Sequence, residues 1–99
     1  MNDLSSVRVT VNGVSTLRDV IRKDMTMILP TGSTIFDLVN RLEEEFGSKY
    51  RAVTGEDLRE VIERLFTVTI NGKLPTPIRN FDTALRDGDE LVFFQWTGA

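Results

Sequence analysis

The sequence predicts an α+β domain in which a small mixed sheet packs on one side against one main helix. Two patterns carry this prediction. Apolar and polar residues alternate at residues 7–11, 25–29 and 66–70, as in strands, and an amphipathic stretch with helical period occupies residues 34–46. A short helical stretch and a last apolar stretch complete a two-layer order of elements. With 99 residues and no low-complexity tract, the chain is expected to form one domain over residues 1–99.

The first two strands are joined by a connection too long for a tight hairpin. Three valines alternate with polar residues between positions 7 and 11, and an Asn-Gly pair then marks a turn. Alternation returns at residues 25–29, after which Pro30 ends the second strand. In between, Leu17, Val20 and Ile21 fit one turn of helix, and the segment fits a crossing loop equally well.

The main helix has a clear start. Thr34 can cap it, and Asp37 completes a pair of the capping-box type. Its apolar stripe consists of Ile35, Leu38, Val39, Leu42 and Phe46. Gly47 is predicted to stop the helix, so the acidic residues 43–45 are interpreted as its solvated last turn rather than as a patch for a basic partner. The same apolar pattern predicts a second, shorter helix at residues 56–65.

The last third of the chain is predicted to return to the sheet. Residues 66–70 read as a third strand closed by a second Asn-Gly turn. Two prolines limit residues 73–85 to an edge strand or a loop. A turn at residues 87–89 precedes the final strand, residues 91–96, whose first four positions are all apolar.

Composition narrows the classes of function. The net charge is −3 with interspersed signs, so no basic stripe favours a nucleic acid partner. The chain has no Cys and no His, which removes the thiol nucleophile, the usual general base and the commonest metal ligands. Because the acidic residues read as solvated faces, no catalytic side chain and no metal site are expected. Without a signal-peptide pattern or a membrane-spanning apolar run, the protein is expected to be cytoplasmic and to have no membrane partner.

Three stretches resemble the MoaD/ThiS family of ubiquitin-like β-grasp proteins. They are "LPTGSTIFDLVNRL", "VTINGK" and, most specifically, "LRDGDELVFF" near the end of the sequence. The resemblance covers nearly the whole chain. A second helical segment at residues 56–65 is most similar to the small subunit of molybdopterin synthase and to the small archaeal modifiers.

The resemblance implies a sulfur carrier whose reactive group is its own C-terminal carboxylate. In this family a partner enzyme uses ATP to adenylate that carboxylate, and a sulfur donor converts it to a thiocarboxylate. The expected partners are this adenylating enzyme and a larger synthase subunit, with no cofactor bound to the carrier. A role as small subunit of a molybdopterin synthase-type complex, in molybdenum or tungsten cofactor biosynthesis, is implied. The alternative is a ubiquitin-like modifier, or a non-carrier protein-binding module with an inert tail.

The sulfur-carrying tail is expected to be Gly98 and Ala99, which differs from the two glycines usual in the family. Thr97 is also stiffer than a small tail residue. Three interpretations stay open. The tail works as it stands with an adapted activating enzyme, Ala99 is removed to leave Gly98 last, or the protein binds partners without carrying sulfur.

The final strand is expected to present one face to the helix and one to a partner. The register that matches the family places Leu91 and Phe93 in the core. The opposite face and the tail that follows it form an apolar, partner-binding stripe of Val92, Phe94, Trp96 and Thr97. In the alternative interpretation, Trp96 packs over the sheet or over residues 75–78.

Overall fold

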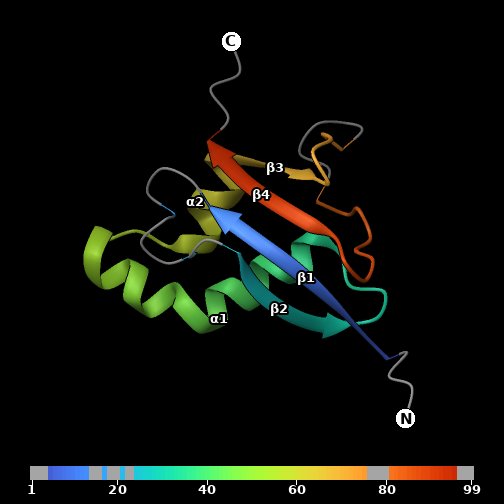
Figure 1. Ribbon diagram of the computed structural model, residues 1–99. Helices are drawn as coiled ribbons and strands as arrows, with labels where there is room; N and C mark the ends of the chain where they lie inside the picture. Colours follow the sequence, from blue (N-terminus) through green and yellow to red (C-terminus); the bar gives the residue numbers. More distant parts are fainter. Residues whose placement is uncertain (1–4, 14–16, 18–20, 22–23, 76–80, 96–99) are drawn as a thin grey trace.

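The computed structural model describes residues 5–13, 17, 21, 24–75 and 81–95 (Figure 1). Within these ranges the chain forms four strands and two helices. In chain order they are β1 (Ser6–Gly13), β2 (Met25–Pro30), α1 (Ile35–Thr54), α2 (Leu58–Leu65), β3 (Phe66–Ile70) and β4 (Glu90–Gln95).

The four strands form one mixed sheet in the order β2-β1-β4-β3. The two central strands, β1 and β4, pair in parallel, whereas β2 and β3 pair antiparallel with their neighbours. Figure 1 shows α1 and α2 on the same side of this sheet. The predicted architecture, a small mixed sheet packed on one main helix with a short second helix, is confirmed. In the described residues between β3 and β4 no further strand forms, so that part of the connector is a loop, as one of the two alternatives held.

A single core lies between the sheet and the helices. The largest fully buried side chains come from every strand except β2, from both helices and from the connection after β1, and are Phe66, Phe93, Leu17, Ile21, Ile35, Leu38, Leu42, Leu58, Ile62, Leu91, Val9 and Val11. In the β1–β2 connection, Ile21 N–H donates to the Leu17 carbonyl at 2.7 Å, which is helical spacing. The described positions therefore favour a helical turn there, while Val20 lies outside the described residues.

The start of α1 is held by its own cap and by the connector. Thr34 and Asp37 form the predicted capping box, because each side chain accepts the other residue's backbone N–H, at 3.2 and 2.9 Å. The next two free donors are also used. Ile35 N–H donates to the Thr83 carbonyl at 3.0 Å, and Phe36 N–H donates to the Phe81 carbonyl at 2.8 Å. The connector thus fixes where α1 begins.

The end of α1 differs from the prediction. The helix runs through Gly47 and ends at Thr54, with Gly55 as a left-handed cap (φ 78°) whose N–H donates to the Arg51 carbonyl. The predicted stop at Gly47 is wrong, and residues 43–45 lie in the middle of the helix rather than in its last turn. Neither of the described helices is long and apolar enough to cross a membrane.

Gly47 is a glycine because a neighbouring side chain occupies the place of a Cβ. The carboxylate of Glu43 lies directly over its Cα. From there Glu43 reaches the start of α2 and accepts the backbone N–H of Arg59 at 2.9 Å, which Asp57, the N-cap, also accepts at 3.2 Å. The carboxylates of Glu43 on α1 and of the N-cap Asp57 therefore share a backbone N–H at the N-terminus of α2, where the helix dipole favours negative charge.

The surroundings of Asp57 at the junction of the two helices stabilise the charged form of its carboxyl group. Its pKa is held below the ordinary value of 3.8, first by the hydrogen bond with the Glu43 side chain and then by the Arg59 N–H and the charge of Arg51. A carboxyl whose pKa is lowered by folding stabilises the folded state above that ordinary value, and this contribution is lost as the pH falls through the lowered pKa. The second helix is two residues shorter than the predicted range 56–65, because Glu56 and the N-cap Asp57 precede it.

We predict that Gly47→Ala does not give the stability that alanine usually adds inside a helix. The usual gain is about 1 kcal/mol. Here the new methyl group displaces the Glu43 carboxylate and costs the hydrogen bond to α2, so we expect the free energy of unfolding to stay level or to fall. Urea unfolding of the purified protein measures this.

The matched control is the same substitution in a Glu43→Ala background. With the carboxylate absent, Gly47→Ala should stabilise by about 1 kcal/mol, so that the two changes are non-additive by a similar amount. Equal effects of Gly47→Ala in both backgrounds would show that the carboxylate does not control this position.

Candidate functional site

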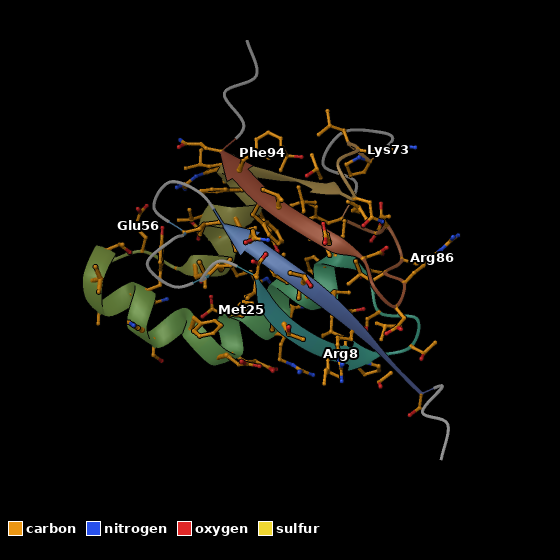
Figure 2. The ribbon with its side chains drawn as sticks, viewed as in Figure 1. Arg8, Met25, Glu56, Lys73, Arg86 and Phe94 are labelled. Carbon is orange, nitrogen blue, oxygen red and sulfur yellow. The ribbon has the colours of Figure 1, made fainter. Side chains whose placement is uncertain are left out.

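The strand β4 divides its side chains between the core and the open face, as predicted. Leu91 and Phe93 are fully buried beneath the sheet. Val92 and Phe94 point to the opposite face and are half-buried, and Figure 2 shows Phe94 at the end of β4 from which the chain leaves the sheet. The remaining predicted site residues, Trp96, Thr97, Gly98 and Ala99, lie outside the described residues.

Residues from both neighbouring strands surround these two side chains. In the register of the sheet, Phe94 lies opposite Thr67, and Val92 lies between Thr69 on β3 and Asn12 on β1. We call this group the β4 patch, made of Asn12, Thr67, Thr69, Val92 and Phe94. All but one of its members are half-buried, so the patch is partly accessible rather than a fully exposed stripe.

Thr67 is the exception in the patch. Its side chain is fully buried, and its hydroxyl oxygen has no hydrogen-bond partner in the part of the chain that the structure describes. A buried hydroxyl without a partner lowers stability by about 1 to 3 kcal/mol. The end of the sheet nearest Phe94 therefore contains a polar group that the described fold does not satisfy.

The position of β4 is set by the turn that precedes it. Asp87 accepts the backbone N–H of Arg8 through Oδ1 at 2.8 Å, and Gly88 N–H donates to the Arg8 carbonyl at 2.7 Å. Gly88 has φ 90°, a left-handed conformation that glycine adopts without strain. Together the two residues continue the pairing with β1 for one step before the strand itself starts.

Asp89 and Asn71 join this turn to the one that follows β3. Asp89 is buried and accepts Arg86 N–H at 2.8 Å and the Asn71 amide at 3.0 Å. Asn71, at φ 53°, accepts Glu90 N–H through its side chain at 2.9 Å and donates its own N–H to the Glu90 carbonyl at 2.7 Å. These bonds fix the register of β4, and hence the point at which the chain leaves the sheet.

Sequence reasoning missed these two positioning residues. The stretches "VTINGK" and "LRDGDELVFF" were noted as turns and as family markers, but nothing local shows that Asn71 and Asp89 bind each other. The available signal was an acidic residue directly before an apolar strand, together with an asparagine at a left-handed turn position.

The described part of the candidate site is an apolar, partly accessible surface. Within the described ranges no three acidic residues lie together as metal ligands would. A half-buried aromatic and a half-buried valine lie beside the exit of the chain, which suits contact with another protein.

The sequence model of the ThiS family matches residues 9–98, which includes β4 and the segment after it. The chain belongs to the ThiS family. No curated protein matches the sequence closely enough to count as a relative.

Solved structures agree on the fold of this ThiS-family chain. The solution structure of the HVO 2177 protein of Haloferax volcanii is similar at a TM-score of 0.70 and 22% identity, covering 100% of this chain and 92% of that one. The small archaeal modifier protein 1 of Methanosarcina acetivorans gives 0.61 at 19% identity, with 95% and 97% covered. The putative molybdopterin converting factor subunit 1 of Pyrococcus furiosus gives 0.60 at 19% identity, with 90% and 97% covered. The architecture is the ubiquitin-like β-grasp that the sequence resemblance predicted.

We predict that Thr67→Val stabilises this ThiS-family domain. Valine has nearly the same shape and removes the unsatisfied hydroxyl, so we expect a gain of about 1 kcal/mol, or a rise in Tm of about 4 to 8 °C. Scanning calorimetry measures both quantities.

Thr69→Val is the matched control, because Thr69 lies on the same strand and the same face but is half-buried. Its effect should stay within about 0.5 kcal/mol. A loss of stability in Thr67→Val would instead show that the hydroxyl is satisfied in solution.

Proposed function

We propose that the protein is a sulfur carrier of the ThiS/MoaD type and that its reactive group is the C-terminal carboxylate of the Gly98-Ala99 tail. The observation that supports this most directly is the family match, which extends to residue 98 and so includes the segment after β4. The carrier contributes no catalytic side chain in this proposal. The adenylating enzyme supplies the active site and uses ATP.

The proposed chemistry follows from the poor reactivity of a carboxylate. Attack of a carboxylate oxygen on the α-phosphate of ATP releases pyrophosphate and gives an acyl adenylate, which has a good leaving group. A hydrosulfide ion from the sulfide source then attacks the carbonyl carbon, a C–S bond forms, the C–O bond to AMP breaks, and loss of the S–H proton leaves a thiocarboxylate and AMP. The tail must be thin to enter the active sites concerned, which Gly98 favours. Ala99 adds one methyl group, which an adapted enzyme accommodates or which is removed with the residue.

The β4 patch is proposed as the surface that the adenylating enzyme and a larger synthase subunit bind. Phe94 and Val92 supply apolar contact beside the exit of the chain, with Trp96 and Thr97 completing the surface. Because β4 is bonded to β1 on one side and to β3 on the other, the patch has a fixed place on the sheet beside Gln95, after which the chain continues. We propose that these encounters occur in the cytoplasm.

Two finer roles have specific support. A small subunit of a molybdopterin synthase-type complex is supported by the similarity to the Pyrococcus furiosus protein, and a modifier role by the similarity to two archaeal modifier structures. The two differ in the fate of the activated carboxylate. A sulfur carrier delivers sulfide to a partner's substrate, whereas a modifier forms an amide with a lysine of another protein.

We predict that the protein gains one sulfur in exchange for one oxygen when it is incubated with its cognate adenylating enzyme, ATP and a sulfide source. Intact-mass spectrometry detects this exchange. A chain truncated after Thr97 is the matched control and should stay unchanged. If neither adenylate nor mass change forms with an enzyme shown to be active on another carrier, the carrier role is wrong. Appearance of lysine-linked conjugates in place of the thiocarboxylate would favour the modifier.

We predict that Phe94→Asp weakens binding to the adenylating enzyme tenfold or more, which corresponds to about 1.4 kcal/mol. The half-buried position should accept the change without unfolding of the domain. Isothermal titration calorimetry measures the affinity, and the Tm reports on the fold.

The control for this variant is Val53→Asp, which makes the same kind of change on α1, where the side chain is 69% exposed. It should leave binding to the enzyme unchanged. Equal weakening by both variants would show that the contact is not centred on the β4 patch.

A further inference from the structure

The strand β2 forms one edge of the sheet, separated from β4 by β1. The backbone groups of Arg8 and Thr10 point toward β4, because Arg8 bonds Asp87 and Gly88 and Thr10 N–H donates to the Asp89 carbonyl at 2.9 Å. Their register partners on β2 are Ile28 and Thr26. Arg8–Ile28 and Thr10–Thr26 are therefore non-hydrogen-bonded pairs of the antiparallel β1–β2 ladder. The N–H and C=O groups of Thr26 and Ile28 point away from β1, out of the edge of the sheet.

This outward row of backbone groups is only partly satisfied. Arg41 Nη1 on α1 donates to the Ile28 carbonyl at 3.2 Å, and Ser33 N–H donates to the Pro30 carbonyl at 3.1 Å. Within the described ranges, no residue bonds the N–H of Ile28 or either backbone group of Thr26. Both residues are exposed. The edge therefore offers three hydrogen-bonding groups in a row to another strand.

A groove with acidic walls runs beside this edge. It has a volume of about 320 Å³ and lies between the end of β2 and the first half of α1, lined by Leu29, Pro30, Ser33, Asp37, Asn40, Arg41 and Glu44. Figure 1 shows α1 running along β2 on the face of the sheet that the helices cover. Arg41 is the one cation of the lining, and it lies 3.8 Å from Glu44 and 4.0 Å from Glu45. Negative charge therefore exceeds positive charge along the groove.

We propose that the β2 edge binds an extended basic segment of a partner protein, which adds a strand to the sheet. Alternate side chains of an added strand point to opposite faces. Those on the open face would lie beside Ile28, which is apolar and 51% exposed, so apolar residues fit there. Those on the helix side would lie over Asp37 and Glu44, so Lys or Arg fits there.

A second copy of this chain suits the edge poorly. Pairing two β2 edges would bring two acidic grooves together, and the strand sequence MTMILP carries no basic residue to offset them. Charge therefore favours a basic segment of another protein over self-association.

Arg41 controls access to the edge in this proposal. Its guanidinium occupies the Ile28 carbonyl that an incoming backbone N–H would need. The side chain is 35% exposed and has two carboxylates within reach, so it can leave the carbonyl without losing its ionic partners. The contact thus protects the edge in the free protein and can be exchanged on binding.

The test uses the blocked hexapeptide Lys-Val-Lys-Val-Lys-Val and the full ¹⁵N-labelled chain. Titration followed by two-dimensional NMR should shift the amide signals of Thr26 and Ile28 most strongly. The peptide Glu-Val-Glu-Val-Glu-Val should bind more weakly. The largest shifts at the β4 patch, or no shifts at millimolar peptide, would overturn the proposal. Shifts at Thr26 and Ile28 that depend on protein concentration without peptide would assign the edge to self-association instead.

Two variants separate backbone pairing from charge. Thr26→Pro removes an outward N–H without breaking the ladder to β1 and should weaken binding roughly fivefold. Glu44→Lys should weaken it roughly threefold or more at low salt. Glu60→Lys, an equal change of charge on α2, is the matched control and should have a smaller effect. Equal weakening by both lysine variants would mean that only overall charge attracts the peptide. This surface is separate from the β4 patch, so its failure would leave the proposed function untouched.

Discussion

Parallel pairing between the first and last strands is the constraint on which the rest of the structure depends. β1 and β4 come from opposite ends of the described chain and lie side by side in the centre of the sheet. The pairing is started by the Asp87–Gly88 turn, which bonds both backbone groups of Arg8 before β4 begins. β3 is attached to the sheet only through β4, and α2 leads directly into β3. The place of β3 in the sheet therefore depends on the central pair as well.

The loop before β4 connects this centre to the main helix. Its Phe81 and Thr83 carbonyls accept the first free N–H donors of α1. Its Leu85 N–H donates to a carbonyl of the turn that precedes that helix. Buried Asp89 then links the same loop to the turn after β3. Three segments distant in sequence thus meet at one end of the sheet. The described part of this connector has no regular secondary structure, yet its backbone hydrogen bonds tie it to the start of α1 and to β1.

The sequence alone predicted the structure correctly wherever the residues that determine it lie close together along the chain. Alternation of the valines predicted the first strand, and the register that matches the family predicted the inward facing of Leu91 and Phe93. Thr34 and Asp37 predicted the start of α1 because both partners of that cap lie within one turn. The facing of Val92 and Phe94, the part of the candidate site that the structure describes, followed from that register and from the alternation of side chains along a strand.

The sequence was insufficient where the cause is a distant partner. Gly47 resembles a helix stop, and only the path of Glu43 toward α2 shows why a glycine stands inside a continuous helix. Asn71 and Asp89 are ordinary turn residues until the fold brings them within 3.0 Å. The free edge of β2 was equally hidden, because the direction of its backbone groups depends on what β1 bonds on its other side.

The central place of β4 also has a mechanical consequence. A partner that grips the segment after Gln95 pulls along the axis of a strand with a bonded neighbour on each side. Such a force is resisted by both ladders at the same time, as shear, whereas an edge strand can be peeled away one bond at a time. A domain built in this way keeps its sheet closed when its last strand is pulled along its axis.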